Sequence, residues 1–447
     1  MGSPNSTEFG SGRGDGVDAA KQPKDWKFLT DTAWNYGAFA LMAGTGVLIN
    51  FFIAAFMGVE ALGVFNQVFA IFLVTGQLAV LGLHDSAQKH AAEFADAPEV
   101  LSASATASVQ AAFLVGSAVA VFLYLLSPAI AAVTNSEAVG AGAAIIAPGV
   151  AMFALNKTLL GVLNGMRRMR EFAIGQSLRI VTILVVCFVV GLNDAPPEFL
   201  ALSFTVAEAF VLVLLLIVVR PTLRRFDPEA RTWVRNHLRF GVRALPNGFL
   251  NESFIRIDVI MLGIFVSDSV VGVYSFAAMF VEGLFQVPVV VRVVANPVLV
   301  PLVRDGDWRG LARFAKRIAA AGIVIFALAA AVALLILPYL APFFPEGLVD
   351  QAYGLLFPLL GGLLIYAAFV PLDHILLQAG MPGRQSLLMS VNVICNIVLN
   401  AILIPEYGIW GAAYATATAF ILSAVTLNIA AGRWLGMKRG VLFEKQD

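Results

Sequence analysis

Long apolar stretches alternate with short polar connections along the whole chain, and no other feature restricts its fold as strongly. A helix that crosses the hydrocarbon core of a membrane needs about 20 mostly apolar residues. We count twelve such stretches, centred near residues 46, 72, 114, 151, 182, 209, 256, 287, 328, 366, 395 and 420. The sequence therefore predicts an all-α membrane protein with twelve transmembrane helices and no separate soluble domain.

The composition supports a membrane protein and is unlike that of a soluble domain. Of the 447 residues, 59% are hydrophobic and only 13% are charged, whereas about a quarter of the residues in ordinary soluble domains are charged. Cys187 and Cys395 each lie inside an apolar stretch, without metal-ligand spacing or a disulfide framework. We therefore expect no metal, no organic cofactor and no nucleic-acid partner.

Basic residues are confined to one side of the expected membrane. The two tails and every second connection hold 25 of the 29 Lys and Arg residues. The remaining connections hold no basic residue; their acidic residues are Glu60, Glu137, Asp194, Glu198, Asp268, Glu346, Asp350 and Glu406. Because connections rich in Lys and Arg stay in the cytoplasm, the pattern predicts that both termini are cytoplasmic.

The two halves of the chain resemble each other. GVEALGVF (58–65) parallels SDSVVGVY (267–274), and GVLNGMRRMREF (161–172) parallels LLQAGMPGRQSL (376–387). Both halves start on the same side, so we expect two six-helix parallel repeats around a central cavity, where transporters of this kind bind substrate. The expected divisions are a disordered tail (1–30), an N-lobe (31–220), a linker (221–244), a C-lobe (245–432) and a second tail (433–447).

The linker between the lobes carries a basic amphipathic pattern. Asp227 and Pro228 are typical of the start of a helix, and Arg231, Arg235 and Arg239 follow at steps of four residues. Such a helix lies on a membrane surface and attracts anionic lipid. We expect the linker to lie on the cytoplasmic leaflet, with anionic phospholipid as a partner.

Ionisable residues also occur inside the apolar stretches. A charge at the centre of a bilayer costs about 3 kcal/mol or more unless it is compensated, so such residues are functional candidates. The positions corresponding to Arg256 and Asp258 in the first half are Val47 and Ile49, which indicates that the charges are not a general requirement of the lobe. The candidates are Lys157, Arg179, Arg256 and Arg292, and Glu208, Glu252, Asp258, Glu282, Asp373 and His374.

The cations suit a site for phosphate. Lys157, Arg256 and Arg292 all lie about 12 to 15 Å from the cytoplasmic ends of their helices, and arginine binds phosphate oxygens bidentately. Arg179 lies closer to the cytoplasm, where it either joins this cavity or extends toward the membrane surface. A second interpretation remains open, in which each cation is neutralised within its own lobe. Glu252 and Arg256, for example, have the spacing of an intrahelical pair.

The acidic residues suit ion coupling, because an intramembrane carboxylate can take up H⁺ or bind Na⁺. Asp258 and Glu282, both near the middle of a stretch, are the leading candidates. Asp258 is an equally good structural partner for Arg256 or Arg292. Asp373 and His374 form either a proton relay or a pair satisfied by interfacial water. Glu208 has no cation on its own stretch.

Several segments resemble one known family. NVICNIVLNAILIPEYGIWGAAYATATA (392–419), IRIDVIMLGIFVSDSVVGVYSFAAMF (255–280) and LGLHDSAQKHAAEF (81–94) resemble the polysaccharide-exporter branch of the multidrug/oligosaccharidyl-lipid/polysaccharide exporter superfamily. The resemblance implies a flippase that carries undecaprenyl-diphosphate-linked oligosaccharide, such as an O-antigen or exopolysaccharide repeat unit, across the bacterial inner membrane by ion-coupled alternating access. It also implies the polysaccharide polymerase machinery as a partner.

Two other functions remain as alternatives. A cation-coupled multidrug exporter of the same superfamily would carry organic cations, which four intramembrane cations would repel. A membrane glycosyltransferase or ligase would act on the same lipid. The sequence lacks paired carboxylates on a sizeable external loop and a soluble catalytic domain. We therefore expect a transporter.

Overall fold

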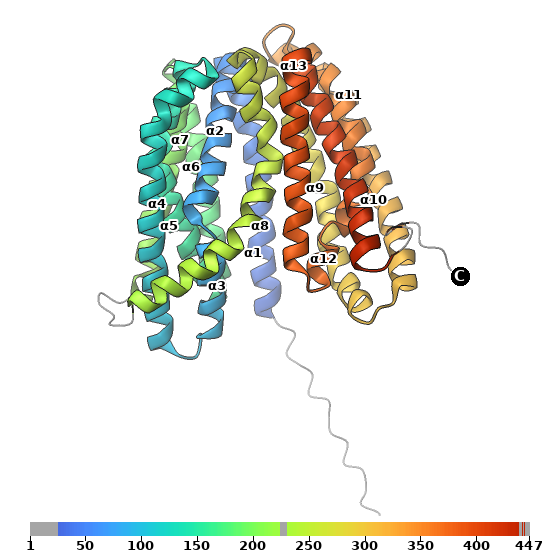
Figure 1. Ribbon diagram of the computed structural model, residues 1–447. Coiled ribbons are helices and arrows are strands. Elements are labelled where there is room, and N and C mark those ends of the chain that lie inside the picture. Colours follow the sequence, from blue (N-terminus) through green and yellow to red (C-terminus); the bar gives the residue numbers. More distant parts are fainter. Residues whose placement is uncertain (1–25, 224–229, 438–439, 441, 443–447) are drawn as a thin grey trace, which may run out of the picture.

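The computed structural model describes residues 26–223, 230–437, 440 and 442, and within these residues the fold is all helical (Figure 1). The expected tail at residues 1–25 and the Asp227–Pro228 pair lie outside the described residues. The α-helices are α1 Trp26–Phe52, α2 Val59–Val80, α3 Leu83–Glu93, α4 Pro98–Thr134, α5 Glu137–Gly165, α6 Met169–Leu192, α7 Leu202–Val219, α8 Ala230–Phe265, α9 Asp268–Arg304, α10 Trp308–Ile336, α11 Leu348–Ala367, α12 Ile375–Gln378 and α13 Pro382–Trp434. Short helical turns link them: η1 Ile53–Met57, η2 Pro197–Ala201, η3 Arg220–Thr222, η4 Leu337–Phe343 and η5 Val370–Leu372.

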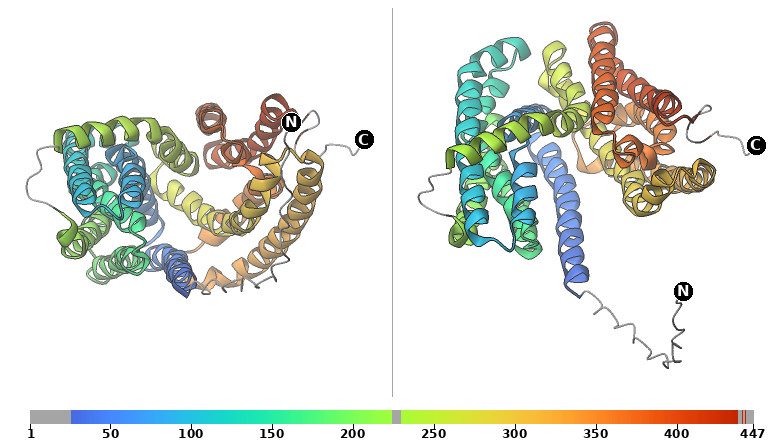
Figure 2. Two further views of the ribbon diagram at one scale, coloured as in Figure 1. Left: turned by 90° about the horizontal axis from the view of Figure 1, so that it is seen from below. Right: turned by 60° about the horizontal axis from the view of Figure 1, so that its bottom comes forward.

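The helices form two bundles side by side (Figure 1; Figure 2 shows them from below). The N-lobe contains α1 to α7, and the C-lobe contains α9 to α13. Helix α8 starts low on the front of the first lobe in Figure 1 and rises into the space between the two. We call the end where α1 begins and α13 ends the basic end, because the arginine-rich connections lie there; it is at the bottom of Figure 1. The opposite end is the acidic end.

The number of membrane crossings stays a prediction. In the described part of the chain, nine helices are long and apolar enough to cross a membrane. All twelve expected centres lie in helices, but α1 and α8 are not among the nine, and α13 is counted once. The apolar part of α8 contains three charged residues, which lowers its hydropathy. A fold of many apolar helices nevertheless establishes a multi-pass membrane protein.

Helix α13 accounts for two of the expected stretches. Its 53 residues are interrupted at Gly408, whose backbone angles (φ 54°, ψ −129°) are not helical. Only glycine adopts such angles without steric cost. The Thr426 hydroxyl donates to the side-chain oxygen of Asn392 at 2.8 Å, so the two halves of α13 lie side by side as a hairpin.

The lobes are in backbone contact at the acidic end. A Cβ atom on Gly63 of α2 would lie 1.9 Å from the carbonyl oxygen of Asp268, and a Cβ atom on Gly272 of α9 would lie 1.9 Å from that of Val59. The two glycines therefore allow α2 and α9 to approach more closely than any other residue permits.

Polar and aromatic contacts strengthen the same junction. The Gln67 amide and the Ser136 hydroxyl of the N-lobe each donate to the Asp268 carboxylate at 2.6 Å. Phe51 of α1 stacks on Phe276 of α9 with ring centroids 5.9 Å apart. One continuous hydrophobic core crosses the junction, so the acidic end is closed between the lobes.

The expected linker helix is the first part of α8, which continues to Phe265 without a helix end at residue 244. We expected its apolar face to lie on lipid, but that face packs against protein. Val234 and Leu238 pack against Leu83, Ala111 and Ala112 of the N-lobe. On the opposite face the basic residues Arg231, Arg235 and Arg239 are exposed. Their contact with anionic phospholipid stays a prediction.

A buried histidine holds this part of α8 on the N-lobe. His237 is fully buried. Its Nε2 donates to the backbone oxygen of Ser104 at 3.0 Å, and its Nδ1 lies 2.8 Å from the Ser86 hydroxyl. The His90 ring packs edge-on against it, with centroids 5.2 Å apart. Burial, reinforced by the nearby His90, lowers the pKa of His237 from 6.5 to about 4, so the ring is neutral at pH 7.

Acidification is expected to destabilise the protein through His237. Because its folded pKa lies below its unfolded value, its contribution is complete above pH 6.5 and is lost as the pH falls toward 4. The linkage corresponds to about 2 kcal/mol between pH 7.5 and pH 5. Melting temperatures of wild type and His237→Gln at the two pH values measure it. The same pH dependence in both proteins would exclude His237 as its source.

Candidate functional site

Three intramembrane cations bind carboxylates on neighbouring segments of the described chain. The pairs are Arg179 with Glu208, Arg256 with Glu282, and Arg292 with Asp373. The two members of each pair lie on different segments. A charge in a low-dielectric interior is costly unless an opposite charge compensates it, so each pair holds its two segments together. This arrangement matches the interpretation in which the cations are neutralised within each lobe.

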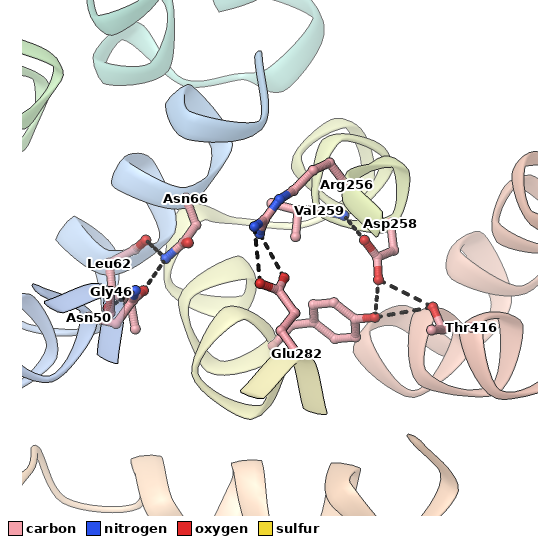
Figure 3. A network of polar contacts seen from close by, with 10 residues as sticks. Gly46, Asn50, Leu62, Asn66, Arg256, Asp258, Val259, Glu282 and Thr416 are labelled. Carbon is pink, nitrogen blue, oxygen red and sulfur yellow. Dashed lines mark hydrogen bonds and ion pairs between the residues drawn. The ribbon is translucent and has the colours of Figure 1, made fainter. Parts of the chain in front are cut away.

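The Arg256–Glu282 pair lies between the two lobes (Figure 3). Nη1 and Nη2 of Arg256 on α8 donate to the two carboxylate oxygens of Glu282 on α9 at 2.7 and 3.0 Å. The guanidinium also lies 4.9 Å from the ring centroid of Phe69 on α2, in the N-lobe, a favourable cation–π contact. The side chains are 16% and 35% exposed, so the pair is accessible from the interlobe space.

Asp258 points away from this pair, toward α13 (Figure 3). Its carboxylate accepts hydrogen bonds from the Tyr274 hydroxyl, from Thr416 at 3.2 Å and from the backbone nitrogen of Val259 at 2.9 Å. Its hydrogen bonds therefore do not hold Arg256 or Arg292, which corrects the structural role that we considered for it. The side chain of Glu252 lies outside the described residues, and the observed partner of Arg256 is Glu282.

Arg292 and its partners line a cavity inside the C-lobe. Nη1 of Arg292 donates to both oxygens of Asp373 at 2.8 and 3.1 Å, and His374 lies 4.0 Å from the same carboxylate. The cavity has a volume of about 230 Å³ and is bounded by α8, α9, α11 and α13. Gln286 and Arg292 of α9 thus line the C-lobe interior, whereas Glu282 on the same helix belongs to the pair between the lobes.

In the N-lobe, Arg179 turns inward and does not extend to the membrane surface. Its Nε donates to Glu208 at 2.6 Å, and Glu208 is only 1% exposed. The Asn156 amide donates to the same carboxylate at 2.7 Å. Lys157 and Arg179 both lie over the ring of Phe153, at 5.6 and 5.4 Å from its centroid. Two cations therefore lie over one aromatic ring, and one of them is paired with a buried carboxylate.

Removing the Glu208 carboxylate is expected to destabilise the N-lobe strongly. The Glu208→Ala variant leaves the largely buried Arg179 without its counter-charge, which costs about 3 to 5 kcal/mol. The Arg179→Met/Glu208→Leu double variant removes both charges and is expected to stay close to wild type. Melting temperatures in detergent compare the three proteins. A Glu208→Ala variant as stable as the double variant would contradict a structural pair.

The sequence alone did not single out the aromatic and hydroxyl groups that contact these charges. Phe69 and Phe153 looked like ordinary apolar residues, and only the spatial contact with a cation distinguishes them. Tyr274 and Thr416 lie in segments quoted for the family resemblance, but no role followed from that. Among the described side chains, no group of three or more His, Cys, Asp or Glu residues is placed to hold a metal ion.

Comparisons with known proteins agree on family and fold. The family model "Polysaccharide biosynthesis protein" matches residues 28–304. A multidrug resistance MATE family transporter of the MOP superfamily in an inward-facing conformation is similar in structure (TM-score 0.73, 16% identity, 89% of this chain and 94% of the other). So is the lipid II flippase MurJ in an inward closed conformation (TM-score 0.72, 13% identity, 90% and 87%). An outward-facing MATE family structure gives a TM-score of 0.58 (15% identity, 93% and 97%). No curated protein matches the sequence significantly.

Proposed function

Since the chain belongs to the polysaccharide biosynthesis protein family, we propose that it is a flippase for undecaprenyl-diphosphate-linked oligosaccharide. Its cargo would be an O-antigen or exopolysaccharide repeat unit, carried across the bacterial inner membrane. The family and a fold shared with transporters support a membrane transporter. The observation that carries the specific proposal is the partly exposed Arg256–Glu282 pair between the lobes.

In this proposal, Arg256 binds the diphosphate of the lipid. A guanidinium has five N–H donors in a planar fork, and Glu282 accepts from two of its nitrogens. A diphosphate carries more negative charge than one carboxylate and offers more acceptor oxygens, so it competes with Glu282 for the guanidinium. Lys157, which lies over Phe153 in the N-lobe, would be a second cation for the diphosphate.

The coupling ion would act on this competition. Uptake of H⁺ or Na⁺ by Glu282 neutralises the carboxylate and releases Arg256 for the substrate. Loss of the ion restores the pair and expels the diphosphate. Asp258, which is 6% exposed, is the second candidate for ion uptake, and Asp373 with His374 the third. Arg179 and Arg292 bind carboxylates away from the Arg256–Glu282 pair and would act indirectly.

The direction of entry follows from the junction between the lobes. The contacts of Gly63, Gly272 and Asp268 close the acidic end, so substrate in this conformation would enter from the basic end, which we expect to face the cytoplasm. Export then requires this junction to open. After release outside, the glycan would pass to the polysaccharide polymerase machinery, while the exposed arginines of α8 contact anionic phospholipid.

Transport in reconstituted vesicles tests the proposal. Purified protein is expected to move a fluorescent undecaprenyl-diphosphate-linked sugar between leaflets and to restore surface glycan in an export-deficient strain. Transport of a cationic dye by the same vesicles, without movement of the lipid, would favour the multidrug exporter. Formation of a new glycosidic product would instead favour a glycosyltransferase or ligase.

A further inference from the structure

The cavity in the C-lobe is built differently from the interlobe site, and its size limits what it can hold. Its volume is about 230 Å³. An apolar cavity of about 150 Å³ already accommodates one benzene ring, whereas drug-sized ligands need about 300 Å³ or more. The cavity therefore fits one six-membered ring with substituents.

The walls of the cavity combine aromatic and polar groups. Phe254, Phe285 and Tyr366 are lining residues, and the last two stack with centroids 6.4 Å apart. The lining also includes planar polar groups, among them Arg292 and Asp373. A pyranose has two apolar C–H faces and a rim of hydroxyl groups that both donate and accept, so it matches a cavity with aromatic walls and a polar edge.

Two polar side chains have bonding capacity left for a ligand. Gln385 is 3% exposed, and its amide donates to the backbone oxygen of Asp373 at 2.8 Å. Its Oε1 is buried and has no hydrogen-bond partner among the described residues. Among the described residues, the hydrogen bonds from Arg292 to Asp373 involve only its Nη1 atom. A buried acceptor without a partner costs about 1 to 3 kcal/mol, which a ligand hydroxyl would recover.

The cavity adjoins the proposed diphosphate site. Gln286, a lining residue, follows Glu282 by one turn of α9, and Phe254 precedes Arg256 by two residues on α8. One turn of helix is about 5.4 Å long. Because α8 and α9 run in opposite directions, both relationships place the cavity on the basic side of the Arg256–Glu282 pair. A group attached to the diphosphate lies within reach of it.

From this arrangement we infer that the C-lobe cavity binds the first sugar of the substrate, the single pyranose joined directly to the lipid diphosphate. The inference rests on the proposed function, since it takes the diphosphate to be at Arg256. The remaining sugars would lie outside this cavity. The protein thus selects its cargo by one ring and tolerates variation in the rest of the oligosaccharide.

Filling the cavity tests the inference. Met389 of α13 lines the cavity, so Met389→Trp occupies the space of the ring, whereas the neighbouring Leu387 is 55% exposed on the outer face, and Leu387→Trp is the matched control. Gln286→Ala is a milder second variant, which removes a polar lining group without adding volume. Binding to protein in lipid nanodiscs is measured for bare undecaprenyl diphosphate and for the same lipid carrying glucose, galactose, N-acetylglucosamine or glucuronic acid.

We expect wild type and Leu387→Trp to bind at least one sugar-bearing lipid about tenfold more tightly than the bare lipid, a difference of 1.4 kcal/mol. Met389→Trp should lose this difference and Gln286→Ala should reduce it, while both bind the bare lipid normally. Equal binding of bare and sugar-bearing lipids by wild type, or a preserved difference in Met389→Trp, would overturn the inference alone. Failure of wild type to bind any of these lipids would instead overturn the proposed function.

Discussion

Glycan export is expected to fall about 10- to 150-fold when Arg256 is replaced by alanine, because hydrogen bonds to charged groups contribute about 1.5 to 3 kcal/mol. The change removes the guanidinium that joins α8 to Glu282 and lies on Phe69. Export is measured as surface glycan in a complemented strain, normalised to the amount of protein in the membrane. Arg256→Lys keeps the charge but not the planar fork, so it should recover only part of the activity.

The same pair also has a structural role, and a charge swap separates the two contributions. The Arg256→Glu/Glu282→Arg double variant keeps two opposite charges on α8 and α9, so its melting temperature should approach that of wild type. It moves the cation to the other helix and should remain defective in export. Wild-type export by Arg256→Ala, or by the swapped protein, would remove the arginine from the substrate path and leave the pair with a structural role only.

Gly63→Val is expected to open the junction at the acidic end and to reduce export more than tenfold. Valine adds a Cβ where the nearest atom, a backbone oxygen of Asp268, would be 1.9 Å away, and real contacts are essentially never shorter than 3.0 Å. Backbone cannot rotate aside as a side chain does, so α2 and α9 must separate. A transporter that works by alternating access then loses the conformation that receives substrate.

Distances between spin labels on the two lobes measure this change. One label pair is placed at the acidic end (Asn193 and Glu346) and another at the basic end (Glu93 and Arg313), all at exposed positions. In Gly63→Val we expect the first distance to lengthen and the second to shorten. Gly361→Val, at an exposed helical glycine with open space around it, controls for the effect of valine on a helix. Unchanged distances in Gly63→Val would show that the lobes are not joined through this contact.

The family, the helical class and the exposed basic face of α8 could be predicted from local patterns. Arg231, Arg235 and Arg239 share a face because their spacing matches the helical repeat, and no knowledge of their neighbours is needed. The other face of the same helix was predicted wrongly, because Val234 and Leu238 suit lipid and protein equally well. Hydropathy measures the preference to leave water, not what replaces the water.

The candidate site, too, could be predicted only in part from the sequence. Because a charge inside an apolar stretch is costly, the sequence alone identified Arg179, Arg256 and Arg292 and the carboxylates that bind them. It did not identify the pairs, since the partners are 29, 26 and 81 residues apart and only the packing of helices brings them together. The one pair considered from local spacing, Glu252 with Arg256, stays a prediction, because the side chain of Glu252 lies outside the described residues.

The sequence by itself therefore determined which segments leave water, and which residues are too costly to bury alone, because both properties add up along the chain. The tertiary structure alone decided which charges meet, where the two glycines let the lobes touch, and that a ring-sized cavity lies beside Arg256. Those features depend on the directions of side chains on neighbouring helices. These directions are set by the packing of helices that are separate in the sequence, so no periodicity within one segment predicts them.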